Sequence, residues 1–150
     1  MNNEFAVAIS VYYNDSSVYV KRALESIWDT QTVRPTQIVL VVDGPVGTPI
    51  LDIIKEFETH CPVLKVVQLA ENAGSGNAMR VAMDEVDCEL IARMDSDDVS
   101  APTRFEEQLR FFAENPDVDV LGGDISEFVG EEENIVAYRR VPATDHEIKN

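Results

Sequence analysis

The sequence predicts an α/β fold in which a mainly parallel central sheet is covered by helices on both faces. Short apolar runs without polar alternation recur along the chain and are typical of strands buried on both faces. They alternate with segments whose apolar residues recur at helical spacing. A β-α-β-α-β-α-β order implies right-handed crossovers and therefore parallel strands.

The expected elements follow from these patterns. Four strands are predicted over residues 5–11, 37–42, 63–69 and 89–94. Helices are predicted from Val18, from Pro49, after the turn at residues 72–76, and from Ser100 to about residue 115. Two further strands are expected, over residues 118–129 with a break near Gly122-Gly123, and around residues 135–141. No repeat or linker interrupts the pattern, which predicts a single domain over residues 1–150.

The net charge excludes some classes of partner. The chain carries 28 acidic and 12 basic residues, for a formal charge of −16. Such a surface repels phosphate backbones, so no nucleic-acid partner is expected. Cys61 and Cys88 lie in no metal or redox pattern and are expected to be buried, reduced thiols. No apolar run is long enough to span a membrane. We therefore expect a cytoplasmic protein, or one held peripherally at the inner membrane face in a longer chain.

Ligands of open parallel sheets bind beyond the carboxyl ends of the strands. This rule selects three segments: residues 11–14 after the first strand, Asp43-Gly44 after the second, and residues 95–98 after the fourth. We therefore expect the functional site to form where these three segments meet.

The segment Asp95-Ser96-Asp97-Asp98 is the strongest chemical signal. Three carboxylates within four residues repel one another unless a cation neutralises them. Oxygen ligands suit Mg²⁺ or Mn²⁺, and Mg²⁺ usually takes one or two protein carboxylates and fills its shell with water and substrate phosphates. Asp95 and Asp97 therefore predict a divalent cation together with a phosphate-bearing ligand. The alternative is a solvated turn in which Asp98 and Ser100 cap the next helix.

A calcium-binding loop is a poorer interpretation of the same residues. Asp95, Asp97 and Glu106 have the right spacing, but Ser100 replaces the required glycine and Pro102 interrupts the loop.

Other polar residues near the strand ends are candidate ligand contacts. Asp43 could accept a hydrogen bond from a nucleobase or a ribose, or it could only begin a turn. Tyr12 could stack on a base. Residues 72–76, which begin at Asn72, have the glycine content of an anion-binding turn at a helix N-terminus. Arg80 is one of few cations and could meet a phosphate or form a salt bridge.

Taken together, the motifs resemble family 2 of the glycosyltransferases, which have the GT-A fold, a Rossmann-like three-layer α/β/α architecture. The resemblance covers nearly the whole chain. It rests on an ordered set of short motifs: Ile9-Ser10-Val11-Tyr12-Tyr13-Asn14, Ala23-Leu24-Glu25-Ser26-Ile27, Ile38-Val39-Leu40-Val41-Val42-Asp43-Gly44, Glu71-Asn72-Ala73-Gly74, Ile91-Ala92-Arg93-Met94-Asp95-Ser96-Asp97-Asp98, Pro102-Thr103-Arg104-Phe105-Glu106 and Val120-Leu121-Gly122-Gly123.

The resemblance implies a nucleotide-diphosphate sugar donor, most often a uridine diphosphate sugar, and a saccharide or lipid-linked acceptor of cell-surface polysaccharide synthesis. It implies that Val11, Tyr12 and Asp43 hold the nucleoside of the donor. Asp95 would contact the ribose or the metal shell, and Asp97 would be the main protein ligand of the cation. Members of the family invert the anomeric centre, with a carboxylate as general base.

Two departures from the family pattern affect these expectations. Asn77 stands where relatives often carry a lysine, so a phosphate contact would be either missing or supplied by Arg80. The family's general base lies well downstream of the acidic motif, so we expect no catalytic residue within these 150 residues. We therefore expect a truncated piece that binds the donor but transfers sugar poorly or not at all.

Two other functions remain open at this point. A sugar-phosphate nucleotidyltransferase would share the layout, but it normally carries a glycine-rich basic loop after the first strand, where this chain has residues 12–15 without glycine or base. A non-enzymatic metal-binding α/β module would bind the cation without any dependence on nucleotide.

Overall fold

The computed structural model describes residues 4–149, and the chain divides into two compact units between Ala113 and Glu114. The first unit contains eight elements: β1 (Phe5–Val11), α1 (Ser17–Trp28), β2 (Gln37–Val42), α2 (Thr48–Glu58), β3 (Leu64–Gln68), α3 (Ser75–Asp84), β4 (Leu90–Met94) and α4 (Arg104–Glu114), whose last residue opens the second unit.

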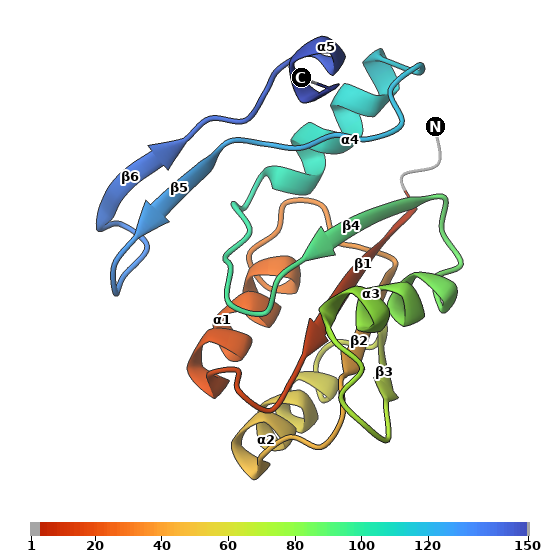
Figure 1. Cartoon of the computed structure of the whole chain (residues 1–150), viewed down its shortest axis with the longest axis vertical. Coiled ribbons are helices and arrows are strands. Elements are labelled where there is room, and N and C mark those ends of the chain that lie inside the picture. Colours follow the sequence, from red (N-terminus) through yellow and green to blue (C-terminus); the bar gives the residue numbers. More distant parts are fainter. Residues whose placement is uncertain (1–3, 150) are drawn as a thin grey trace. The chain divides into compact units, whose positions relative to one another are not determined.

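The sheet of the first unit has the strand order β3-β2-β1-β4, and every pair in it is parallel (Figure 1). In β1, Ala8 lies opposite Val39 of β2 and Arg93 of β4. The predicted parallel sheet is therefore confirmed. Since all four strands run the same way, their carboxyl ends lie along one edge of the sheet.

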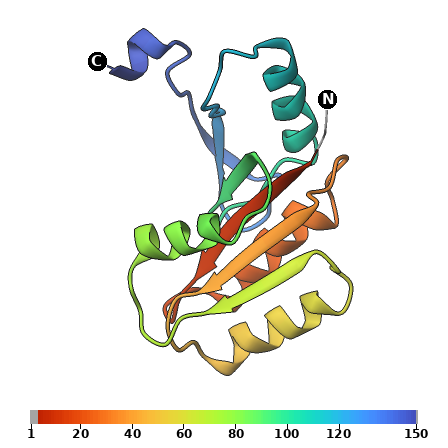
Figure 2. The same cartoon turned by 90° about the vertical axis from the view of Figure 1, so that its right-hand side faces the viewer.

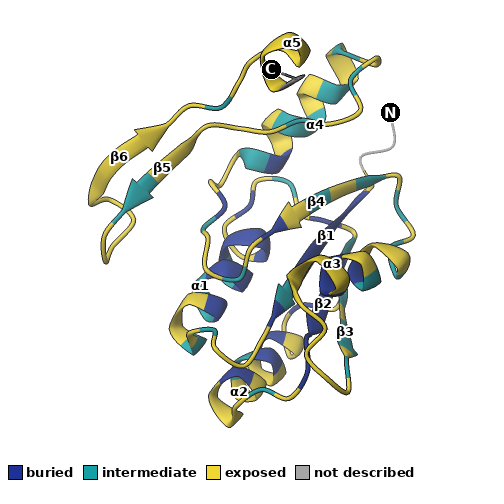
Figure 3. Ribbon diagram, in the orientation of Figure 1, coloured by how far each residue is buried: buried dark blue, intermediate teal, exposed yellow. Residues whose placement is uncertain are grey.

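Helices cover both faces of this sheet, α1 and α2 on one side and α3 on the other (Figure 2). Alternate residues of a strand face opposite sides. Val7 and Ile9 accordingly pack in the core that includes side chains of α1 and α2, whereas Ala8 packs with α3. Nearly all of β1 and β2 is buried (Figure 3). Burial on both faces explains why these strands have no polar alternation.

Helix α4 begins four residues later than the sequence predicts, at Arg104 and not at Ser100. The preceding segment is tied to the α1 side of the molecule instead. The backbone N–H of Ser100 donates to Ser26 Oγ, and the backbone N–H of Thr32 donates to the carbonyl of Pro102. These long-range bonds hold residues 100–102 in a non-helical path.

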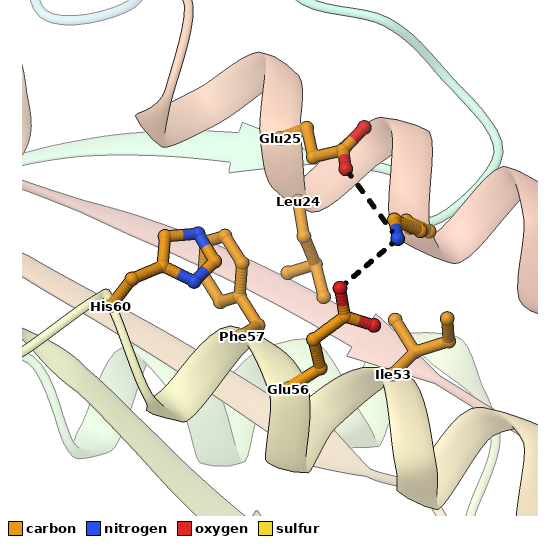
Figure 4. A pocket seen from close by; sticks show the side chains of 7 residues that line it. Leu24, Glu25, Ile53, Glu56, Phe57 and His60 are labelled. Carbon is orange, nitrogen blue, oxygen red and sulfur yellow. Dashed lines mark hydrogen bonds and ion pairs between the residues drawn. The ribbon is translucent and has the colours of Figure 1, made fainter.

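Helices α1 and α2 also meet through polar groups. Glu25 of α1 and Glu56 of α2 point toward the ammonium group of Lys21, at 3.9 and 3.1 Å (Figure 4). The cavity beneath them is only about 10 Å³, close to the minimum that holds one water molecule. It is a packing gap between the helices, and it is too small for an organic ligand.

The second unit contains an antiparallel hairpin of β5 (Ile125–Phe128) and β6 (Ile135–Arg139), followed by α5 (Asp145–Lys149). Both strands are shorter than predicted, and residues 118–124 form no strand. Gly122, Gly123 and Asp124 have low strand propensity, and the Asp124 carboxylate accepts a hydrogen bond from the backbone N–H of Val141.

Two smaller expectations can be compared with the structure. Both cysteines are free thiols, but only Cys61 is buried, and Cys88 is half-buried. Burial raises the pKa of the Cys61 thiol. Within residues 4–149, no helix combines the length and apolar character needed to cross a membrane.

Candidate functional site

A cleft of about 380 Å³ opens at the carboxyl ends of β1, β2 and β4. It brings together the three segments that the sequence analysis selected. Six predicted site residues line it: Val11, Tyr12, Asp43, Asn72, Asp95 and Asp97. Gly74 and Ser75 of the predicted anion-binding turn and Ser96 of the predicted acidic segment also line it. Two residues that were not predicted as site residues, Ser10 and Asp15, complete the lining.

The acidic turn after β4 presents carboxylates with different partners. Asp95 is paired with Arg93, Nη2 to Oδ1 at 2.8 Å. Among residues 4–149, Asp97 has no hydrogen-bond or ion-pair partner, although its exposed side chain lines the cleft. Asp97 is therefore a solvent-facing carboxylate that is available to a ligand in the cleft.

Burial, together with the nearby charges of Asp97 and Asp95, raises the pKa of Asp98. Arg104 and Arg93 act in the opposite direction. The Arg104 guanidinium also holds the residues on either side of the acidic turn, because it donates to the carbonyl of Arg93 at 3.1 Å and to Ser100 Oγ at 3.1 Å.

The residues at this turn fit a hard divalent cation that shares its shell with phosphate. Asp95 and Asp97 offer carboxylate oxygens to the same cleft. Within the described part of the chain, no group of three or more acidic, histidine or cysteine side chains could enclose a metal by itself. Mg²⁺ usually takes only one or two protein carboxylates beside substrate phosphates, so two carboxylates facing an open cleft suit it.

Asp43 is buried, and its carboxylate faces the β3–α3 turn. Its Oδ1 accepts from the backbone N–H of Ala73 at 2.7 Å. Its Oδ2 accepts from the backbone N–H of Gly74 at 3.0 Å and from the Asn72 amide at 3.2 Å. A carboxylate has about four acceptor positions, so these bonds leave room for about one more donor from the cleft. The same bonds direct Asn72, Ala73 and Gly74 toward Asp43.

Asp15 connects two walls of the cleft. Its Oδ2 accepts from the backbone N–H of Tyr12 at 3.0 Å and from the hydroxyl of Ser96 at 2.9 Å. Asp15 was not predicted as a site residue because Asn14-Asp15-Ser16-Ser17 is typical of a helix start. A signal was present in its position, since it follows the first strand at the edge where ligands bind.

Arg80 lies outside this cleft. It pairs with Asp84 at 2.8 Å and lines a neighbouring hollow of about 410 Å³, to which Arg93 also contributes. Ser75 lines both the cleft and the hollow.

Similarity to known proteins agrees with this geometry. The model of the family "Glycosyl transferase family 2" matches residues 7–149. An uncharacterized glycosyltransferase of Haemophilus influenzae is 38% identical over 145 residues, which are 97% of this chain and 54% of that protein. UDP-Gal:alpha-D-GlcNAc-diphosphoundecaprenol beta-1,3-galactosyltransferase of Escherichia coli is 31% identical over 83% of this chain and 45% of its own length. The chain spans about half the length of the curated relatives it matches.

Solved structures show the same architecture. S. aureus TarS 1-349 in complex with UDP-GlcNAc has a TM-score of 0.66 and 26% identity, over 75% of this chain and 32% of that one. Mannosyltransferase PcManGT from Pyrobaculum calidifontis, in complex with GDP-Man and Mn2+, has a TM-score of 0.62 over 87% of this chain and 36% of that one, and at 20% identity it supports the fold alone. The expected GT-A fold is confirmed, and the chain belongs to glycosyl transferase family 2.

Proposed function

We propose that this chain supplies the donor and metal site of a glycosyltransferase that uses a nucleotide-diphosphate sugar, most simply a uridine diphosphate sugar. The acceptor is a saccharide or lipid-linked saccharide of cell-surface polysaccharide synthesis. The observation that carries the proposal is the unpartnered carboxylate of Asp97, which lines the same cleft as Asp43 and Tyr12.

The arrangement of charges supports a donor with a diphosphate. A chain of net charge −16 repels an anionic ligand. A diphosphate in this acidic cleft therefore needs a divalent cation or backbone N–H groups to offset the repulsion, and the acidic turn favours a cation. When bound, a divalent cation stabilises the negative charge that develops on the leaving nucleotide.

The chain's own residues position the donor. In this proposal Asp97 is the main protein ligand of the cation, and Asp95 contacts the ribose or the metal shell. Val11 and Tyr12 form the wall against which the nucleoside lies. Asp43 uses its remaining acceptor position for a nucleoside donor group, and its bonds to residues 72–74 hold Asn72 at the rim. Arg80 takes part only if it leaves Asp84 for a phosphate, since both lie in the adjoining hollow.

The proposed reaction is a direct displacement at the anomeric carbon with inversion. The bond from that carbon to the diphosphate oxygen breaks, and the nucleoside diphosphate leaves with the electron pair. The acceptor oxygen forms the new bond and gives its proton to a carboxylate base.

Named relatives support the choice of donor and acceptor. TarS has been solved with UDP and with UDP-GlcNAc. One relative is named as a galactosyltransferase that acts on a diphosphoundecaprenol-linked sugar, and another belongs to amylovoran biosynthesis in Erwinia amylovora, at 31% identity over 96% of this chain and 53% of its own length.

The experiment is a thermal unfolding series with UDP alone, Mn²⁺ alone and both together. At a ligand concentration of about one hundred times Kd, binding adds roughly 2.7 kcal/mol to stability. For a chain of this size that raises Tm by about 5–10 °C. We expect the shift to require both components, to disappear in Asp97→Asn, and to persist in Asp87→Asn, an exposed aspartate outside the cleft.

The series also separates the alternatives. A shift with Mn²⁺ alone would support a metal-binding module without nucleotide. A shift that persists in Asp97→Asn would contradict the proposed metal ligand.

A further inference from the structure

We propose that Asp15 is a positioning residue that locks the loop after β1 to the acidic turn after β4, and so sets the distance between the nucleoside wall and the metal ligands. The effect on ligand binding rests on the proposed function, whereas the hydrogen bond between Asp15 and Ser96 is present in the chain without any ligand. No part of the motif resemblance or of the similarity to known proteins assigns this residue a role.

Strand pairing between β1 and β4 ends before the chain reaches most of the residues that line the cleft, so it does not join the loops that follow these strands. The β1–β4 pairing ends at Ile9 opposite Met94. Beyond that pair, the chain continues on one side to Tyr12 and on the other to Asp95 and Asp97, all of which line the cleft. Across the described residues, the hydrogen bond from Ser96 Oγ to Asp15 Oδ2 is the only one that joins residues 10–16 to residues 95–98.

Asp15 links the positions of these two loops because it accepts a hydrogen bond from each of them. A single oxygen, Oδ2, accepts both from the backbone N–H of Tyr12 and from the hydroxyl of Ser96. The first bond fixes the carboxylate to the backbone of its own loop. The second holds Ser96, the residue between the two carboxylates proposed to face the cation. Both Asp15 and Ser96 are half-buried, so water competes less well for the bond between them than it would at an exposed site, whereas the bond from Tyr12 is exposed.

The negative charge of Asp15 causes electrostatic repulsion in the cleft, which a neutral residue with the same hydrogen bonds would avoid. Asp15 adds a negative charge to a cleft that already contains Asp43, Asp95 and Asp97. An asparagine could accept both hydrogen bonds through its carbonyl oxygen without that charge. The pair Asp15→Asn and Asp15→Ala therefore separates the role of the hydrogen bonds from the role of the charge.

The test measures the Kd of UDP at saturating Mn²⁺ by calorimetry. We expect Asp15→Ala to raise Kd about tenfold or more, the change that loss of one charge-assisted hydrogen bond produces. Asp15→Asn should stay within about threefold of the unchanged chain because both bonds can form. Ser96→Ala should weaken binding, and adding it to Asp15→Ala should cost little more, because the two groups act through one bond. Asp52→Ala, an exposed change on α2, is the control.

Backbone amide exchange gives a readout that does not depend on nucleotide. We expect Asp15→Ala to speed exchange at Tyr12, whose N–H loses its acceptor, and at Asp98 in the acidic turn. Ser96→Ala should speed exchange at Asp98 only. If the unchanged chain binds no UDP with Mn²⁺, the proposed function fails, and these exchange rates alone decide whether Asp15 locks the loops.

Two results would overturn the inference. Unchanged exchange at Asp98 in both variants would show that the Asp15–Ser96 bond does not hold the turn. A loss of affinity in Asp15→Asn as large as in Asp15→Ala would show that the charge of Asp15 acts on the ligand directly, and that Asp15 is a binding residue.

Discussion

The carboxylate of Asp43 accepts a hydrogen bond from the backbone N–H of Ala73 at 2.7 Å, across 30 positions of sequence. This bond joins the end of β2 to the turn that begins α3. The neighbouring N–H of Gly74 donates to the second oxygen of the same carboxylate. One buried side chain therefore satisfies two backbone donors and holds a wall of the cleft in place.

Replacing Asp43 tests how much this contact contributes to stability. In Asp43→Asn, an amide NH₂ replaces one acceptor oxygen and faces a backbone N–H, so one donor loses its partner. Loss of a hydrogen bond to a charged acceptor costs about 1.5–3 kcal/mol. We expect a loss of that size in the free energy of unfolding, measured by urea denaturation. Asp52→Asn, on the exposed surface of α2, should change stability little. Equal stability of the two variants would contradict the structural role of Asp43.

Gly44 allows the approach of these two segments. Its φ angle is +82°, and a Cβ atom there would lie 2.5 Å from the backbone nitrogen of Asn72. The left-handed conformation alone costs a non-glycine residue about 1–2 kcal/mol. Since the colliding atoms belong to the backbone, we expect Gly44→Ala to lower stability by more than about 2 kcal/mol.

The control for Gly44 is a glycine that lines the neighbouring hollow. Gly76 lies within α3, and a Cβ atom there meets no atom within 4 Å. Gly76→Ala should stabilise the chain by about 0.5–1 kcal/mol. Urea denaturation of the two variants gives the comparison. A small effect of Gly44→Ala would mean that β2 and residues 71–72 lie further apart.

The sequence predicted the sheet because the physical signal was local. The run Ile38-Val39-Leu40-Val41-Val42 has no polar residue, and such a strand must be buried on both faces. The acidic turn could be predicted too, since three aspartates that directly follow a mostly apolar strand repel one another unless a cation lies among them.

The missed features depend on contacts between distant residues. Asp15 and Ser96 are 81 positions apart, and the residues around each of them do not indicate that the two side chains form a hydrogen bond. Residues 100–102 have the composition of a helix start. They stay non-helical because the Thr32 N–H donates to the Pro102 carbonyl and the Ser100 N–H donates to Ser26 Oγ. A strand was predicted over residues 118–129, yet the sequence alone did not show that pairing begins only at Ile125.

Arg104 is expected to hold the acidic turn through the directions of its hydrogen bonds as well as through its charge. Its guanidinium donates to the carbonyl of Arg93, to Ser100 Oγ and to Gln108 Oε1, at 3.1, 3.1 and 3.2 Å. A lysine keeps the charge but cannot present donors in three fixed directions. We expect Arg104→Lys to lower the free energy of unfolding by about 1–3 kcal/mol.

The matched control lies on the same helix. Arg110 is exposed, and Arg110→Lys should have little effect in the same denaturation experiment. If Arg104→Lys were equally mild, charge alone would account for the contribution of Arg104.

Asp98 should make stability depend on pH in an unusual direction. Partial burial of its carboxylate and the neighbouring charges of Asp97 and Asp95 raise its pKa above the ordinary 3.8. The folded chain therefore binds this proton more tightly than the unfolded chain does. The contribution of Asp98 to the free energy of unfolding falls as pH rises from 3.8 through the raised pKa, and it stays at its lowest value above it.

Asp98→Asn removes this penalty. The variant should be more stable than the unchanged chain at pH 7, and the advantage should disappear as pH falls below the ordinary aspartate pKa of 3.8. The gain will be small because Asp98 is exposed and solvent screens its charge. Urea denaturation from pH 3 to pH 8 measures it, with Asp117→Asn as an exposed control outside the acidic turn. An advantage that grows toward low pH would reverse the sign of the shift, and would mean that Arg104 and Arg93 dominate the charge around Asp98.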